Sequence, residues 1–245
     1  MFIADIVAFF CKAIFMKTIG LIAGMSWQSS LLYYRLINEG VQQRLGGLHS
    51  AQILMHSVDF APIEDLQHRG DWDGAAAILI DAAKKLEAGG ADFFLIATNT
   101  MHRVAEQVVA EVNIPLLHIA DATAKVLQQN EVKRIGLLGT AFTMELDFYK
   151  QRIVEEYGIE VIVPETHDRQ LIHDIIYQEL VQGNVDDDSR EVYLAVIDRM
   201  RDQQIDGIIL GCTEICMLIE PGHCDLPLFD TTAIHAEQAV EMSLC

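Results

Sequence analysis

The sequence is poor in basic residues: it has 17 Lys and Arg against 36 Asp and Glu, a formal net charge of −19 at pH 7. Nucleic acids and anionic membrane surfaces are bound through clustered Lys and Arg, so this imbalance argues against both as partners. A small anionic ligand is still compatible with it, because a few backbone N–H groups at a helix start can bind an anion despite the overall charge.

Cysteines are also few and form no framework. Five is an odd number, and no closely spaced pairs repeat, which predicts reduced thiols in a cytoplasmic protein. Cys212, Cys216, His223 and Cys224 could be read as a metal cluster, but their spacing matches no zinc pattern. Neither of the glycine-containing segments IGLIAGMSW and IGLLGTAF matches a dinucleotide or nucleotide-phosphate loop. We therefore expect no metal and no cofactor.

The first fifteen residues, MFIADIVAFFCKAIF, are the only candidate targeting segment. They are too short to span a membrane, and they lack the basic start and the small-residue cleavage site of a signal peptide. A second methionine, Met16, directly precedes the strand-like KTIGLIAG. We interpret residues 1–15 as an extension outside the fold. A helix packed on the body or on a partner subunit, or a membrane anchor, are the alternatives.

Apolar runs of strand length alternate with amphipathic stretches along the chain, a rhythm that predicts an α/β fold with mostly parallel sheets flanked by helices. Half of the 245 residues are apolar (51%), enough for one large domain or two smaller lobes. The expected strands are 17–23, 51–57, 92–97, 114–118, 133–138, 159–163, 206–210 and 226–229. The clearest expected helices are 27–44, 73–88, 100–111, 143–157, 168–182 and 188–203.

Three segments of the sequence occur twice, in the same order. KTIGLIAGMSWQSSLLYY matches KRIGLLGTAFTMELDFYK, DFFLIATNT matches DGIILGCTE, and IPLLHIADA matches LPLFDTTA. This internal repeat predicts two similar α/β lobes related by a pseudo-twofold axis. We assign residues 16–115 and 228–245 to the first lobe and residues 116–227 to the second.

The repeat places two polar phrases at equivalent strand ends, LIATNTMH in the first half and IILGCTEI in the second. Ligands of open α/β sheets bind beyond the carboxyl ends of the strands, and clefts between lobes are common ligand sites. Thr98 and Cys212 should therefore face each other across one cleft. The residues that follow them begin helices, where free N–H groups and hydroxyls suit a carboxylate, although Thr100 and Thr213 could also act only as helix caps.

A thiol at a helix start has a lowered pKa, which makes Cys212 a candidate base or nucleophile. A buried small apolar side chain is the alternative interpretation of any cysteine. Two acid–base groups on opposite faces of a bound carbon are what a racemase needs, because one removes the α-proton and the other returns a proton from the opposite side. The pair Thr98 and Cys212 suggests this chemistry.

From about Lys17 to its C-terminus the chain resembles the aspartate/glutamate racemase family, and within it the bacterial broad-specificity L-aspartate/glutamate subgroup. The similarity lies in Thr98-Asn99-Thr100-Met101-His102, in Gly211-Cys212-Thr213-Glu214, and in the segments GLIAGMSWQSSLLYYRLIN, HIADAT and FDTTAIHAE. It implies two lobes with the active site in the cleft between them, no pyridoxal phosphate, a homodimer, and an acidic amino acid as substrate.

By the same resemblance, Cys212 is one catalytic acid–base residue and Thr98 occupies the place of the other. The residues implied to bind substrate are Met25, Ser26, Gln67, Asn99, Thr100, Thr140, Thr213 and Glu214. His102 and His118 also lie in family motifs, where a supporting hydrogen bond is at least as good an interpretation as direct catalysis.

Two positions depart from the family pattern. The hydroxyl of Thr98 is a far weaker acid than the thiol that the family has at this position. Val181 aligns with a lysine in the similar segment of aspartate-specific members. The sequence thus predicts a cofactor-independent racemase that interconverts L- and D-aspartate or glutamate by two-base proton transfer. The alternatives are a single-cysteine isomerase or decarboxylase of a small dicarboxylate, and an amino-acid-binding protein that has lost catalysis.

Overall fold

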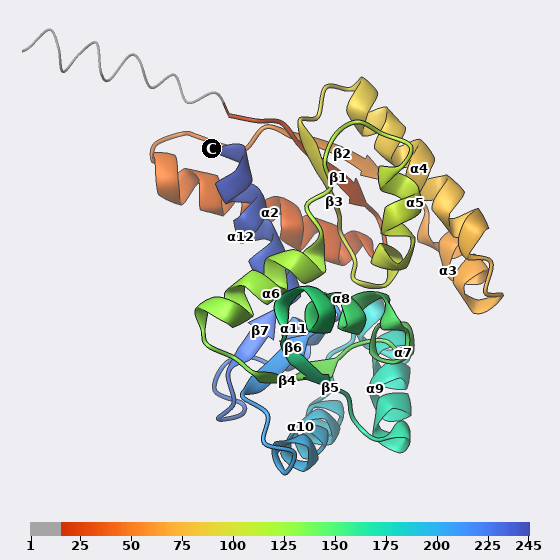
Figure 1. Cartoon of the computed structure of the whole chain (residues 1–245), viewed down its shortest axis with the longest axis vertical. Coiled ribbons are helices and arrows are strands. Elements are labelled where there is room, and N and C mark those ends of the chain that lie inside the picture. The colour runs from red at the N-terminus through yellow and green to blue at the C-terminus, as the bar shows by residue number, and fades with distance from the viewer. Residues whose placement is uncertain (1–15) are drawn as a thin grey trace, which may run out of the picture.

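The computed structural model describes residues 16–245, so the predicted extension over residues 1–15 lies outside the described part of the chain. The described residues form two sheets, one above the other in Figure 1, with helices around each. None of the helices in this range combines the length and the apolar character needed to cross a bilayer.

The first sheet is parallel and has the strand order β2-β1-β3, with β1 at Ile19–Ala23, β2 at Ile53–Ser57 and β3 at Phe93–Ile96. Every residue of β1 and β3 is buried, as expected for a parallel sheet covered on both faces. One face packs against α2 (Trp27–Leu45) and the other against α4 (Trp72–Ala88).

The second sheet is also parallel, in the order β5-β4-β6-β7. Its strands are β4 (Arg134–Leu138), β5 (Glu160–Ile162), β6 (Gly207–Leu210) and β7 (Leu228–Asp230). The helices of this lobe include α8 (Asp147–Tyr157), α9 (Thr166–Gln178) and α10 (Asp187–Arg201), and they enclose a single apolar core. The alternation of strand and helix predicted from the sequence is thus present in both lobes.

The predicted repeat is visible in the pairing of the strands. In each lobe the first strand, β1 or β4, lies between the second and third strands. A single parallel bridge between Phe94 and Leu116 occupies the place of the β6–β7 pair Ile208–Leu228. Segment 114–118 therefore lies beside β3 in the same way that its copy β7 lies beside β6, but it makes only one bridge and forms no strand. The two lobes are pseudo-symmetric, as the sequence predicted.

The chain passes between the lobes twice, and its second passage corrects the predicted domain boundary. Strand β7 pairs with β6 in the second sheet, although residues from 228 onward were assigned to the first lobe. The return begins with α12 (Thr231–Ser243), which packs on α2 and on α6 (Ile119–Gln129), as Figure 1 shows. The repeat explains this boundary. Residues 226–230 pair with the second sheet, just as their copy at 114–118 pairs with the first sheet.

Several helices differ from the predicted ones in length or number. The expected helix at 100–111 is a 3-10 turn, η1 (Thr100–Val104), followed by α5 (Ala105–Val109). Extended backbone at Leu146 divides the expected helix at 143–157 into α7 (Ala141–Glu145) and α8. The expected helix at 168–182 is divided into α9 and a 3-10 turn, η2 (Leu180–Gln182). Four further helices lie outside the expected ranges, namely α3 (Phe60–His68), α6, the four-residue α11 (Ile215–Leu218) and α12.

Candidate active site

A small cavity lies between the lobes, at the carboxyl ends of the central strands. It is lined by all ten residues that the sequence proposed as catalytic or substrate-binding: Met25, Ser26, Gln67, Thr98, Asn99, Thr100, Thr140, Cys212, Thr213 and Glu214. Five residues that were not proposed for the site complete the wall: Phe60, Ile176, Tyr177, Val181 and Gly211. Its volume is about 30 Å³, room for about two water molecules, so the lobes lie close together around the site.

The turn after β1 places Met25 and Ser26 at the cavity. Gly24 has a φ of +99°, and a Cβ atom there would lie 2.2 Å from the carbonyl oxygen of Val58, so only glycine fits this turn. Ser26 then caps the start of α2 by accepting a hydrogen bond from the N–H of Ser29. The cap and the glycine together fix where the Ser26 hydroxyl points.

Glu214 is the polar centre of the second-lobe half of the site. Its Oε2 accepts hydrogen bonds from the thiol of Cys212 (3.0 Å) and the hydroxyl of Thr213 (2.7 Å). Its Oε1 accepts one from the hydroxyl of Ser26 (2.6 Å), which belongs to the first lobe. The carboxylate is 4% exposed and connects the catalytic candidate Cys212 to the opposite wall of the cleft.

The pKa of Cys212 shifts in the direction opposite to the one predicted. The sequence suggested a thiol at a helix start, but α11 has four residues and begins only at Ile215. Burial raises the pKa of the Cys212 thiol well above its ordinary value, and the adjacent Glu214 carboxylate raises it further. In this closed arrangement Cys212 is therefore a protonated thiol at neutral pH, with a carboxylate in place to receive its proton.

Thr98 is held at the opposite wall through its backbone. Its N–H donates to the carbonyl of Ile96 (2.8 Å), and its own carbonyl accepts a hydrogen bond from Nδ1 of His102 (2.8 Å). Nε2 of His102 accepts one from the N–H of Ile119 (3.2 Å), the first residue of α6. Both ring nitrogens of His102 are thus engaged with the backbone, which favours the supporting role over direct catalysis.

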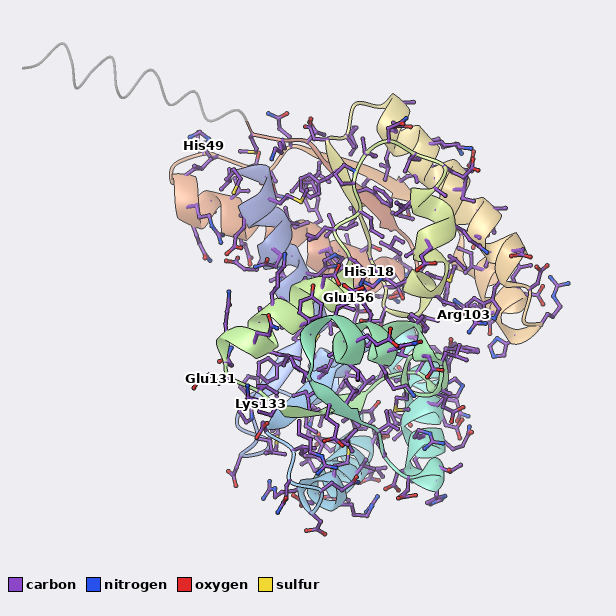
Figure 2. All side chains as sticks on the ribbon, in the orientation of Figure 1. His49, Arg103, His118, Glu131, Lys133 and Glu156 are labelled. Atoms are coloured by element: carbon purple, nitrogen blue, oxygen red, sulfur yellow. The ribbon has the colours of Figure 1, made fainter. Side chains whose placement is uncertain are left out.

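Three buried histidines pack together where the chain passes between the lobes. The ring of His102 lies 4.4 Å from that of His118 and 6.0 Å from that of His235, measured between centroids. His118 accepts a hydrogen bond from the N–H of Ala120 and so caps α6, and Figure 2 shows it at the junction of the lobes. Burial lowers the pKa of both His118 and His235 to about 3, so these rings are neutral at pH 7.

His235 itself was not proposed from the sequence. Its Nε2 donates to the carbonyl of Leu117 (2.8 Å), and its Nδ1 accepts from the hydroxyl of Tyr33 (2.9 Å). It lies in the FDTTAIHAE segment, whose resemblance to the family was the only available signal. The ring ties α12 to the first passage of the chain between the lobes.

Two amide side chains present unpaired oxygen atoms. Asn99 donates from Nδ2 to the hydroxyl oxygen of Thr231 (3.0 Å), and that hydroxyl donates to the carbonyl of Leu210 (2.9 Å), so the orientation of the Asn99 amide is fixed. Its Oδ1 is buried and has no partner among the described residues, and the same is true of Oε1 of Gln67. Leaving a buried acceptor without a hydrogen bond is unfavourable in free energy, so both oxygens are suited to accept a hydrogen bond from a donor group on a ligand.

Hydroxyl groups from both lobes meet on another part of the wall. The Thr100 hydroxyl of the first lobe lies 3.1 Å from that of Thr140 and 3.4 Å from that of Thr143, and the latter two are 3.2 Å apart. Within residues 16–245, no group of three or more His, Cys, Asp or Glu side chains is arranged to hold a metal ion.

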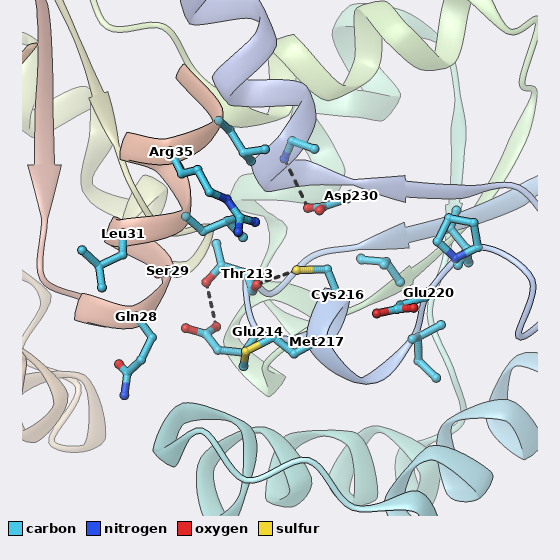
Figure 3. A pocket seen from close by; sticks show the side chains of 17 residues that line it. Gln28, Ser29, Leu31, Arg35, Thr213, Glu214, Cys216, Met217, Glu220 and Asp230 are labelled. Carbon is cyan, nitrogen blue, oxygen red and sulfur yellow. Dashed lines mark hydrogen bonds between the residues drawn. The ribbon is translucent and has the colours of Figure 1, made fainter. Parts of the chain in front are cut away.

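A second, larger cavity of about 760 Å³ lies behind the Thr213–Glu214 segment, which lines both cavities. Figure 3 shows Leu31 and Arg35 of α2 on one side of it and Met217 and Glu220 of the second lobe on the other. Thr98 and Cys212 do not line this cavity, which shares only Thr213 and Glu214 with the candidate active site.

Comparison with known proteins assigns the chain to a family. A sequence model described as Asp/Glu/Hydantoin racemase matches residues 22–239. The chain belongs to this racemase family. It is similar to the crystal structure of a putative Asp/Glu racemase from Yersinia pestis, with 50% identity and a TM-score of 0.88 over 94% of this chain and 100% of that chain.

Two further proteins are similar to this chain over almost their whole length. PH1733, an aspartate racemase homologue from Pyrococcus horikoshii OT3, is 35% identical, with a TM-score of 0.81 over 93% of this chain and 99% of that chain. The broad specificity amino-acid racemase RacX of Bacillus subtilis is 26% identical over 227 residues, which are 92% of this chain and 98% of RacX. The two-lobed fold is thus that of the racemase family.

Proposed function

We propose that this protein is a cofactor-independent amino-acid racemase that inverts the α-carbon by proton transfer between the Cys212 and Thr98 faces of one cavity. The observation that carries the proposal is that the two halves of the internal repeat, Thr98–Thr100 and Cys212–Glu214, line the same closed cavity from opposite lobes. Membership of the racemase family supports the reaction class. The homodimer and the cytoplasmic location expected from the sequence stay predictions.

The polar wall provides for the two groups that every α-amino acid carries. The unpaired Oδ1 of Asn99 is placed to accept a hydrogen bond from the α-ammonium group. The hydroxyls of Thr100 and Thr140 can donate to the α-carboxylate once the lobes separate enough to admit it. Donors on this carboxylate also stabilise the negative charge that spreads onto it when the α-proton leaves.

Proton removal on the second-lobe face begins at Cys212. Its thiol proton moves to Oε2 of Glu214, and the thiolate then takes the α-proton of the enantiomer whose hydrogen faces it. Glu214 was proposed from the sequence as a substrate ligand. Its three hydrogen bonds to Cys212, Thr213 and Ser26 support instead the role of proton acceptor for the thiol.

Proton return on the opposite face involves Thr98. A threonine hydroxyl is too weak an acid to leave a free alkoxide at neutral pH, so it must gain a proton from water as it gives one to the carbanion. The hydroxide formed is neutralised by the proton that Glu214 returns to solvent, which restores the starting carboxylate. His102 does not supply this proton, because both of its nitrogens are bound to backbone groups. The proposed mechanism is therefore asymmetric, with a thiol and carboxylate on one face and a hydroxyl relay on the other.

The test follows α-protons in deuterated water. Purified protein is incubated with each enantiomer of aspartate, glutamate, asparagine and glutamine, and exchange is followed by NMR while inversion is followed by chiral chromatography. Exchange accompanied by inversion supports the racemase. Loss of carbon dioxide would favour the decarboxylase alternative, and binding without exchange would favour the binding-protein alternative.

A further inference from the structure

The cavity wall contains no basic side chain. Among the fifteen residues that line it, Glu214 is the only Asp, Glu, Lys or Arg. Large apolar or aromatic side chains cover the part not occupied by the threonines and Asn99: Met25, Phe60, Ile176, Tyr177 and Val181. A second carboxylate on the substrate would thus meet no opposite charge in this wall.

Burying an ionised carboxylate without a charged or hydrogen-bonding partner is strongly unfavourable. Here the carboxylate of Glu214 would add repulsion, because like charges interact strongly in a site closed to water. Two histidine rings contact Tyr177 of the wall, His68 and His173, whose centroids lie 5.9 and 4.8 Å from that of Tyr177. Burial lowers the pKa of His173, so this ring does not provide the missing cation at neutral pH.

One polar group of the wall has no role in binding the α-ammonium or α-carboxylate. Gln67 is 3% exposed, and its Nε2 donates to Sδ of Met101 (3.0 Å), which leaves Oε1 buried and unpaired. The reverse orientation would place two acceptors against each other, so Oε1 is the atom of this cavity-lining side chain that is left for a donor group. An ionised carboxylate has no proton to donate to it, whereas an amide or a hydroxyl does.

We infer that the side-chain subsite, formed by Gln67 and Val181, selects amino acids with an uncharged, hydrogen-bond-donating side chain over aspartate and glutamate. This inference rests on the proposed racemase function and names its substrate class. It replaces the acidic amino acid implied by the resemblance with an amide-bearing one of the same size. Val181 supplies uncharged surface at the position where the sequence comparison expected a lysine.

Isosteric substrate pairs test the inference directly. The kcat/KM values for glutamine and asparagine are compared with those for glutamate and aspartate, and the Kd of each ligand is measured by calorimetry. We expect the amides to be favoured by about tenfold or more, because a site with an unpaired acceptor rejects a ligand that cannot donate to it. Equal or tighter use of the acids would overturn the inference.

Val181→Lys adds the cation that the wall lacks, and Val181→Met is its uncharged control. The lysine variant should move the ratio of acid to amide use by about tenfold toward the acids, while the methionine variant leaves the ratio close to that of the wild type. If the lysine variant does not fold, Gln67→Met serves instead and should raise the ratio of acid to amide binding, because only the amides lose a hydrogen-bond acceptor. An unchanged acid-to-amide ratio in the variant that is used contradicts the inference.

Calorimetry separates this inference from the proposed function. Preferred binding of the amides without any exchange of their α-protons would contradict the racemase and leave the selectivity standing. Exchange and inversion that are faster for the acids would support the racemase and contradict the selectivity.

Discussion

The two halves of the site are copies of one element with different chemistry. Each follows the end of a buried strand, β3 or β6, and Thr98 occupies the position of Cys212. In the second lobe the thiol donates to the carboxylate of Glu214, whereas the equivalent position in the first lobe is Thr100, a neutral hydroxyl. The two halves share one scaffold, but only the second-lobe half has a thiol with a proton acceptor.

Removing the thiol of Cys212 should cause the largest loss of racemisation among the variants that probe the two halves. Cys212→Ala takes away the base of one face, and we expect racemisation to fall by about 10³-fold or more, within the range for loss of a general acid or base. Chiral chromatography of the products measures the rate. Cys224→Ala is the control, since Cys224 is a free thiol outside the cavity lining, and a similar loss there would show that the effect is not specific to the site.

Glu214→Gln keeps the shape of the side chain and removes its charge. Racemisation should decrease by about 10²-fold, because the thiol loses its proton acceptor. Since the carboxylate raises the pKa of Cys212, the variant should also react with iodoacetamide at lower pH than the wild type. The alkylation profile is recorded without substrate, so an unchanged profile would indicate that Glu214 acts only on the bound amino acid.

Thr98→Cys makes the two faces alike. A thiol is a better proton donor than a hydroxyl, so racemisation should increase by about tenfold, equally in both directions because the enantiomers have the same free energy. Thr98→Ala should retain α-proton exchange of the enantiomer facing Cys212 while losing inversion. If both variants behave like the wild type in deuterated water, Thr98 does not face the α-carbon.

The smallest effect is expected at His102, which positions Thr98. His102→Asn can still donate to the carbonyl of Thr98, and His102→Gln can still accept from the N–H of Ile119. Each variant should lose about 1–2 kcal/mol of unfolding free energy, but inversion should slow severalfold only in the Gln variant. Urea denaturation and chiral chromatography measure the two effects, and equal slowing in both variants would indicate a purely structural role.

The sequence predicted the lobes and the two polar strand ends from local pattern, whereas the other cavity residues were implied by the resemblance to the racemase family. Periodic apolar residues mark the strands, and the polar phrases at 98–102 and 211–214 come directly after two of them. Pairings across the cleft were beyond this reasoning. Ser26 and Glu214 are 188 positions apart, and their hydrogen bond exists only because two lobes pack face to face.

The prediction of a lowered pKa for Cys212 was wrong for a related reason. A sequence shows that a helix follows, but not that the helix is four residues long or that a carboxylate lies 3.0 Å from the sulfur. Phe60, Ile176 and Tyr177 were missed because apolar residues at helical spacing look alike whether they face a core or a ligand. The polar half of the site was therefore predictable and the apolar half was not.

The histidine cluster also ties together the two connections between the lobes. Both passages of the chain lie beside it, where the His102 ring accepts a hydrogen bond from the N–H of Ile119 and the His235 ring donates one to the carbonyl of Leu117. Elsewhere the lobes meet through ring contacts, since His68 and Trp72 of the first lobe pack on Phe142 of the second. We expect these ring contacts, and not the histidine cluster, to break when the lobes separate to admit an amino acid.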